Sequence, residues 1–308
     1  MKELDLGGFL DTSVGRIDAA SLQDTLTEFN IIDEGVKPEI EKLNVDYIDQ
    51  YISDTKIHTE CKFNWQQAMT EAVAFSQLSC PQTRINIANG RSGIIFKDVH
   101  ILASLDLTMD PDKPLSNWLQ KLTGLSHTDV SMTMSGDALE GQFLIPEFVF
   151  KLQDRSHGYL LLQGLSLEAL LSQQPQVGVY ANGTFDGVLP IELINGELTI
   201  TGGHIAARAP GGLIEVANSE AIEQLKQTQP YLDLVFDALE HLNYQQLAGT
   251  LDMQANGDAQ FNIAVKGKSQ DIVRPIHLNY THEENLIQLY RSTQIGNQLQ
   301  SNIEKSVK

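Results

Sequence analysis

Few side chains in this sequence have the type and the spacing that metal binding requires. Asp110 and Asp112 begin like a calcium-binding loop, but Pro114 stands where a third oxygen ligand belongs, so this interpretation fails. His282 lies next to two glutamates and could begin a metal site, yet no second histidine lies at ligand spacing. The sequence therefore predicts no metal site.

Catalytic motifs are also missing from the sequence. It contains no G-x-S-x-G nucleophile elbow, no H-E-x-x-H, no C-x-x-C and no phosphate-binding loop. Asp186 between Phe185 and Gly187 would suit a general base, but an aspartate in a turn that bonds its own backbone is the better interpretation. We therefore predict a protein that is not an enzyme and carries no cofactor.

The two cysteines, Cys61 and Cys80, fit two situations. In an oxidising compartment they would form one disulfide, and in a reducing compartment they would be two half-buried thiols. The first ten residues lack the basic and apolar regions of a secretory signal, so the chain is either cytosolic or part of a longer protein. Spacing alone leaves the compartment open.

Composition limits the possible partners. The 308 residues include 21 lysines and arginines against 40 aspartates and glutamates, which gives a net charge of −19. Such a surface repels nucleic acid and anionic lipid headgroups. Hydrophobic residues make up 42% of the chain and charged residues 20%, so a folded protein is expected. No window reaches the roughly 18 consecutive apolar residues of a membrane helix.

The elements that must position any site are mostly strands. Apolar and polar residues alternate with period two on both sides of Asn256-Gly257, which is typical of a β-hairpin. The same alternation recurs between about residues 56 and 280, with further turns expected at 135–137 and 195–196. Because each strand has one apolar and one polar face, we predict a mainly β, antiparallel architecture.

Helices are fewer in this pattern. The clearest spans 219–243, with a break expected just before Pro230, and a second covers 284–305. Two stretches, 38–53 and 66–78, fit a helix or a strand equally well. Three short helical pieces are also expected, at 21–30, 115–122 and 166–173.

Strands with one apolar face need something to cover that face, and the predicted helices are too few to do so. The strands either close into a sandwich or barrel, or form an open, curved sheet whose apolar lining holds an apolar ligand. Composition and periodicity do not separate these alternatives. The lining would consist of the apolar residues of the alternating strands, namely Met132, Met134, Phe148, Phe150, Leu198, Ile200, Ile205, Met253, Phe261, Ile263 and Val265.

Two segments of the chain resemble a known family. Residues 183–190 read GTFDGVLP and residues 203–212 read GHIAARAPGG. Together they resemble the C-terminal region of the YdbH family, a branch of the AsmA-like superfamily of bacterial envelope proteins. The segment 275–286 resembles the closing strand and acidic helix start of that family. The resemblance covers 90–308 well and 1–89 only by general pattern.

The resemblance implies a non-enzymatic function. It implies a long, curved β-groove that crosses the periplasm from an inner-membrane anchor, and along which phospholipid acyl chains move toward the outer membrane. Residues 90–308 would form the groove region, and 1–89 a mixed α/β N-terminal part. Family members begin with the anchor and are several times longer, so the chain resembles a C-terminal fragment.

Two other functions are weighed against this one. A structural or assembly module of the envelope would have a closed β core and bind only protein. Dicarboxylate transport is an older label of the family, but the sequence contains no cluster of arginines and lysines that would bind two carboxylates.

The resemblance also implies a partner at the C-terminal end. The last strand of an open sheet leaves unpaired N–H and C=O groups, to which a small outer-membrane lipoprotein of the YnbE type would add a strand. Alternatively, the helix at 284–305 caps this edge permanently and no partner binds. A periplasmic location would also make a Cys61–Cys80 disulfide reasonable. The residues expected at the partner edge are Ile276, Leu278 and Tyr280.

Overall fold

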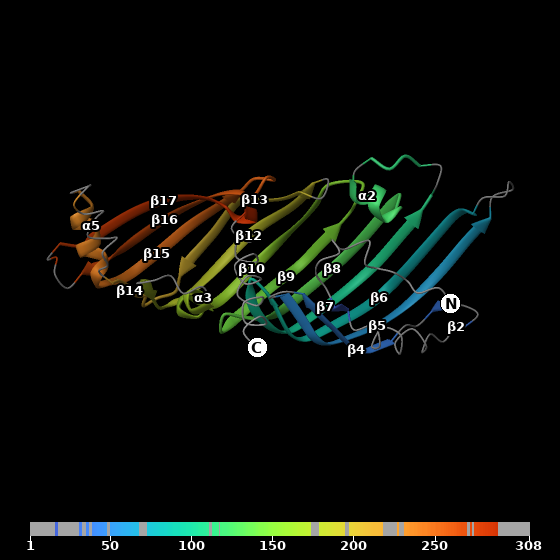
Figure 1. Ribbon diagram of the computed structural model, residues 1–308, viewed down its shortest axis with the longest axis horizontal. Coiled ribbons are helices and arrows are strands. Elements are labelled where there is room, and N and C mark those ends of the chain that lie inside the picture. Colours follow the sequence, from blue (N-terminus) through green and yellow to red (C-terminus); the bar gives the residue numbers. More distant parts are fainter. Residues whose placement is uncertain are drawn as a thin grey trace, which may run out of the picture.

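In the computed structural model, the strands form one large antiparallel sheet that is elongated, curved and not closed into a barrel (Figure 1). This confirms the predicted mainly β, open architecture. The closed β core that a structural or assembly module would have is therefore wrong. No helix in the described part of the chain is long and apolar enough to cross a membrane. The structure describes residues 16–17, 31–32, 35–36, 39–47, 50–67, 73–110, 113–116, 118–173, 179–194, 197–217, 227, 231–269, 272 and 274–288.

Strand order in the sheet largely follows chain order. Each long strand pairs antiparallel with the next one from β4 to β10, and the series continues through β12, β13, β15, β16 and β17. Short strands β11 and β14 extend the sheet beside β15. The long strands are β4 (Glu39–Tyr47), β5 (Gln50–Gln67), β6 (Val73–Ser92), β7 (Ile94–Met109), β8 (His127–Ala138), β9 (Gly141–Phe150), β10 (Ser156–Ser166), β12 (Thr184–Ile194), β13 (Glu197–Ala207), β15 (Leu242–Met253), β16 (Asp258–Ser269) and β17 (Ile276–Asn285), and the short ones are β1 (Arg16–Ile17), β2 (Ile31–Ile32), β3 (Gly35–Val36), β11 (Val179–Ala181) and β14 (Gly212–Val216).

The long strands settle two uncertainties of the sequence. The described residues of 38–53 and 66–78 are mainly strand, in β4, β5 and β6. The strand β6 runs from Val73 to Ser92, across the expected boundary between residues 89 and 90. The division of the chain into those two parts stays a prediction.

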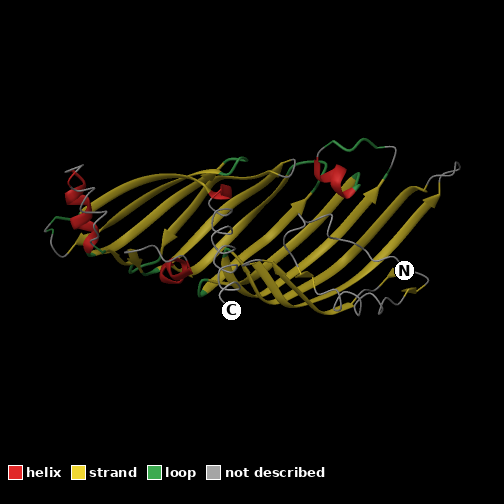
Figure 2. Ribbon diagram, viewed as in Figure 1, coloured by secondary structure: helices red, strands yellow, loops and turns green. Residues whose placement is uncertain are grey.

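The helices that the structure describes lie at the ends of strands and not across a face of the sheet (Figure 2). The helices α2 (Trp118–Thr123) and α3 (Leu167–Gln173) confirm the pieces expected at 115–122 and 166–173. The piece expected at 21–30 lies outside the described residues. Among the described elements, α3 and α5 (Tyr231–Glu240) therefore contact the sheet only near the ends of strands.

Two predicted helices have an end that differs from the prediction. The helix α5 (Tyr231–Glu240) begins directly after Pro230, and β15 already begins at Leu242, so the end of the predicted helix 219–243 is wrong. Residues 219–226 and 228–230 lie outside the described residues. At the other helix, residues 284 and 285 still belong to β17, because they pair with Ala259 and Asp258 of β16. Only its residues 286–288 are described as helical.

The turn predicted at residues 135–137 is wrong, and the turn predicted at Asn256-Gly257 is right. The strand β8 continues through residues 135–137, and the chain turns at Leu139 and Glu140, whose φ angles are 50° and 61°. Positive φ is uncommon in residues other than glycine, so this turn has no sequence signature. The turn at Asn256-Gly257 is confirmed, with φ of 89° at Gly257. The turn expected at 195–196 lies outside the described residues.

Buried apolar residues form three separate clusters along the sheet and no single core. One is centred on Leu165 of β10, and the other two lie on β15 and β16. In the first strands, Cys61 of β5 and Cys80 of β6 form a disulfide, so the oxidised alternative is the one that the structure contains. Residues of α3 pack against the first cluster, and Leu239 of α5 packs against the one that contains Leu242.

Candidate functional site

All the apolar residues predicted to line a groove lie on the same face of the sheet. Residues directly opposite each other in an antiparallel pair point to the same side. Met132 lies opposite Phe148, and the register then leads through Gly158 and Ile191 to Ile200 and Met253. We call this side the apolar face and the other side the polar face. The remaining predicted residues on the apolar face are Met134, Phe150, Leu198, Ile205, Phe261, Ile263 and Val265.

The apolar face also extends into strands for which the sequence nominated no residue. One continuous row crosses β5 to β9 through Ile57, Ile85, Ile101, Met134 and Ile145. The same period-two alternation in β5 to β7 could have found the first three residues. The row makes the apolar surface continuous from the N-terminal strands to the C-terminal ones.

Most residues of this face are neither buried nor fully exposed. Met253 and Val265 are buried among their neighbours on β15 and β16, while Leu198 at 42% exposure is the most open of the predicted set. The other predicted residues are half-buried. Side chains of this face therefore pack laterally against one another while their outer surface stays reachable.

Several phenylalanines on the apolar face lie across glycines of the neighbouring strand. Gly136 is paired with Phe143, and Gly158 is paired with Phe148. A Cβ atom added to Gly136 would lie 2.8 Å from the Phe143 ring, and one added to Gly158 would lie 2.6 Å from the Phe148 ring. Because such distances are too short for van der Waals contact, the rings occupy the space above the glycines.

The polar face is different in chemistry. A shallow hollow of about 1160 Å³ crosses β10 to β17. Its lining combines small and polar residues, such as Ala206, Thr250 and Asn262, with the larger apolar residues Leu161 and Val188 of the same face. The Asn262 amide donates to the Thr250 hydroxyl at 3.3 Å. Ile205, Ile263 and Tyr280 of the apolar face also contribute to the lining, so the hollow is not wholly polar.

An ion pair at the border of this hollow joins three strands. Arg208 donates to both carboxylate oxygens of Asp186, at 2.6 Å from Nη2 to Oδ1 and 2.8 Å from Nε to Oδ2. The Gly164 N–H donates to the same carboxylate at 2.8 Å, and the Arg208 hydrogen bonds lower the pKa of Asp186. Asp186 lies within β12, so its interpretation as a turn residue is wrong. A carboxylate held in this way is a structural link and not a general base.

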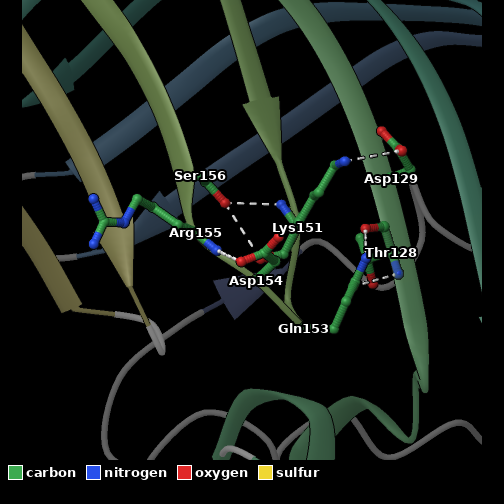
Figure 3. A network of polar contacts seen from close by, with 7 residues as sticks. All are labelled: Thr128, Asp129, Lys151, Gln153, Asp154, Arg155 and Ser156. Carbon is green, nitrogen blue, oxygen red and sulfur yellow. Dashed lines mark hydrogen bonds and ion pairs between the residues drawn. The ribbon is translucent and has the colours of Figure 1, made fainter.

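The ends of β8, β9 and β10 are fixed by a polar network (Figure 3). The Gln153 amide donates to the Thr128 carbonyl at 3.0 Å and accepts from the Thr128 N–H at 2.9 Å. The Ser156 hydroxyl likewise accepts from the N–H of Lys151 at 2.8 Å. Lys151 extends to Asp129, with 3.6 Å between Nζ and Oδ2. This hairpin end therefore presents polar groups to water beside the apolar face.

The predicted partner edge belongs to β17. Ile276, Leu278 and Tyr280 lie on the apolar face, opposite Gly267, Val265 and Ile263 of β16. Within the part of the chain that the structure describes, β17 has no strand on its other side. The described part of the chain contains no group of three histidines, cysteines or carboxylates placed to hold a metal ion.

An open antiparallel sheet with one continuous apolar face is a scaffold of the β-groove class. A comparison with protein families identifies the family: the profile of the YdbH-like family, described as "Intermembrane phospholipid transport protein YdbH", matches residues 32–308. The chain belongs to the YdbH-like family, which confirms the resemblance seen in the sequence. It is a transport family and not a family of enzymes.

A relative in Escherichia coli strain K12 agrees with this assignment. The probable phospholipid transport protein YdbH of that organism is 28% identical to this chain over 193 residues, which cover 59% of this chain and 20% of that protein. The chain thus spans about one fifth of the length of the relative that it matches. No solved structure matches the chain.

Proposed function

We propose that this chain carries phospholipid acyl chains along its apolar face, as a periplasmic segment of a longer protein anchored in the inner membrane. The observation that supports the proposal is the continuous apolar face on an open sheet. Burying apolar surface is favourable by about 25 cal/mol per Å², so an acyl chain gains from lying on this face. The open side lets the polar headgroup stay in water.

Neighbouring residues of β16 provide a direct test. Ile263 and Asn262 lie on opposite faces, and both are half-buried. A photo-crosslinking amino acid at Ile263 should capture phospholipid in cells, while the same amino acid at Asn262 should capture little. Equal capture at both positions, or none at Ile263, contradicts the proposal.

A charge on the apolar face should block the path. Ile263→Asp should reduce phospholipid capture at neighbouring positions, because placing a charge in a water-poor environment costs several kcal/mol. Leu198→Asp is the second variant, since Leu198 is 42% exposed and its replacement spares the packed clusters. Undiminished capture in the folded Leu198→Asp protein would show that lipid does not pass there.

At the C-terminal edge, we propose that β17 accepts a strand from a small outer-membrane lipoprotein of the YnbE type. Among the described residues no strand pairs with the outer side of β17, which supports this, because main-chain groups of an edge strand are available for strand addition. Site-specific crosslinks to the lipoprotein are expected from residues 276–280 in intact cells. Leu278→Pro should abolish them by removing ladder bonds. Crosslinks obtained only from distant strands, such as 130–150, contradict this part of the proposal.

A further inference from the structure

The side chains that β17 contributes to the apolar face change from apolar to polar along the strand. Side chains two residues apart share a face, so Ile276 and Leu278 are followed on that face by Tyr280, His282 and Glu284. The register confirms the placement, because these last three lie opposite Ile263, Phe261 and Ala259 of the apolar face. An apolar row therefore ends in a hydroxyl, an imidazole and a carboxylate.

Aromatic contacts fix the imidazole at this end of the row. The rings of Tyr280 and His282 are stacked, with centroids 5.9 Å apart and an interplanar angle of 21°. The Tyr280 hydroxyl lies 3.1 Å from His282 Nδ1, and the Phe261 ring centroid lies 6.4 Å from that of His282. When the hydroxyl donates to Nδ1, the neutral imidazole carries its proton on Nε2, which is then a donor.

The donor on His282 faces an acceptor on Glu284. Nε2 lies 4.0 Å from Glu284 Oε2, which is longer than a direct hydrogen bond. The other carboxylate oxygen, Oε1, accepts from the Asn285 N–H at 3.1 Å and is thereby oriented. The two side chains are 46% and 40% exposed, so a ligand group can reach both.

We propose that His282 and Glu284 bind the headgroup of a zwitterionic phospholipid with a primary ammonium, of the phosphoethanolamine class. This inference rests on the proposed function, because the acyl chains of the same lipid would lie on the apolar face next to Tyr280. The phosphate accepts from His282 Nε2, and the ammonium, two carbons away, donates to the Glu284 carboxylate.

The charges of this region favour that headgroup over an anionic one. A phosphoglycerol headgroup carries a phosphate but no cation, so it leaves Glu284 uncompensated. The net charge of −19 also disfavours an anionic headgroup. Glu283 lies on the polar face, where it accepts from the Gln260 amide at 3.0 Å, so it faces away from the proposed site.

The test uses the full chain with vesicles of phosphatidylethanolamine and phosphatidylglycerol in equal amounts. Lipids bound to the protein are measured after separation from the vesicles. Glu284→Gln should lower the ratio of phosphatidylethanolamine to phosphatidylglycerol about three- to fivefold, as expected for an exposed ion pair. Glu283→Gln removes the same charge from the adjacent position on the polar face and should leave the ratio nearly unchanged.

His282→Ala gives an independent measurement. Both lipids contain the phosphate, so this variant should reduce the recovery of both and change their ratio little. An unchanged ratio in Glu284→Gln, or an equal change in Glu283→Gln, overturns the headgroup site while the proposed lipid function stands. If the unaltered protein recovers neither lipid, both the headgroup site and the proposed function are wrong.

Discussion

The two ends of the sheet reach stability by different means. In β5 and β6, the buried residues of the apolar face include Thr55, Thr59 and Thr83, and a disulfide joins the two strands. In β15 and β16, most of the buried side chains are apolar, and they form two packed clusters. A single open layer has little interior, so one end uses a covalent link and hydroxyl pairs where the other uses packing.

Removing a packed side chain at the C-terminal end should cause the largest loss of folding stability. Leu242 is 0% exposed and packs against Tyr244 and Val265. Leu242→Ala should lower the free energy of unfolding by about 4 kcal/mol, since the lost contacts leave a cavity. The measurement is urea unfolding followed by circular dichroism. Leu102→Ala, at a residue 56% exposed, is the control and should change stability by less than about 0.5 kcal/mol.

The disulfide should matter most at the N-terminal end. Cys61 and Cys80 are separated by 19 positions. Replacing both with alanine should cost about 3 kcal/mol in the chain-entropy estimate, because the unfolded chain gains freedom. Thermal unfolding of the unaltered protein with and without reductant should show the same loss. Equal midpoints in the two conditions would mean that hydrogen bonding alone holds β5 to β6.

Replacing two threonines of the same face with valine should change the free energy of unfolding in opposite directions. The Thr55 hydroxyl is buried and has no hydrogen-bond partner in the residues that the structure describes. Thr55→Val should therefore raise the free energy of unfolding by about 1 kcal/mol. The Thr59 hydroxyl lies 2.6 Å from that of Thr83, so Thr59→Val should lower it by about 1 kcal/mol. Changes of the same sign in both variants would contradict this assignment.

The smallest effect is expected at the ion pair in the middle of the sheet. Asp186→Asn should cost less than about 1 kcal/mol near neutral pH, because the carboxylate is 47% exposed and screened by water. Its pKa is lowered in the folded protein, so the contribution is complete above the ordinary value of 3.8 and disappears as the pH falls through the folded-state pKa.

Urea unfolding of both proteins at about pH 7 and about pH 3 measures this difference. A stability gap between the two proteins that grows on acidification would have the wrong sign for the proposed link.

Period-two alternation predicted the faces of the sheet well, and local exceptions to it were not visible. The eleven residues nominated from the sequence share one face because hydrophobic alternation is a direct consequence of strand geometry. Whether they contact lipid stays a prediction. Two local exceptions carry no glycine or proline signal. One is the β-bulge at Asp98, whose φ is 48°, and the other is the turn at Leu139 and Glu140. Their conformation is imposed by the neighbouring strands.

Extension of β17 to Asn285 was missed for a similar reason. Glutamates before an apolar run are typical of a helix start, but pairing with β16 continues to Asp258 and keeps these residues extended. The headgroup site that we propose depends on that pairing, since a helix beginning at residue 284 would turn Glu284 away from His282. Local sequence signals could not show which of the two structures is preferred there.

Glycines under the phenylalanine rings determine how close those rings lie to the sheet. With no side chain beneath them, Phe143 and Phe148 lie close to the backbone of the adjacent strand. Alanine at Gly136 or Gly158 would lift the ring above it toward the open side. The clearance available to an acyl chain would then shrink, although the surface would remain as apolar as before. The cross-section of the lipid path that we propose would thus be determined partly by residues that no lipid touches.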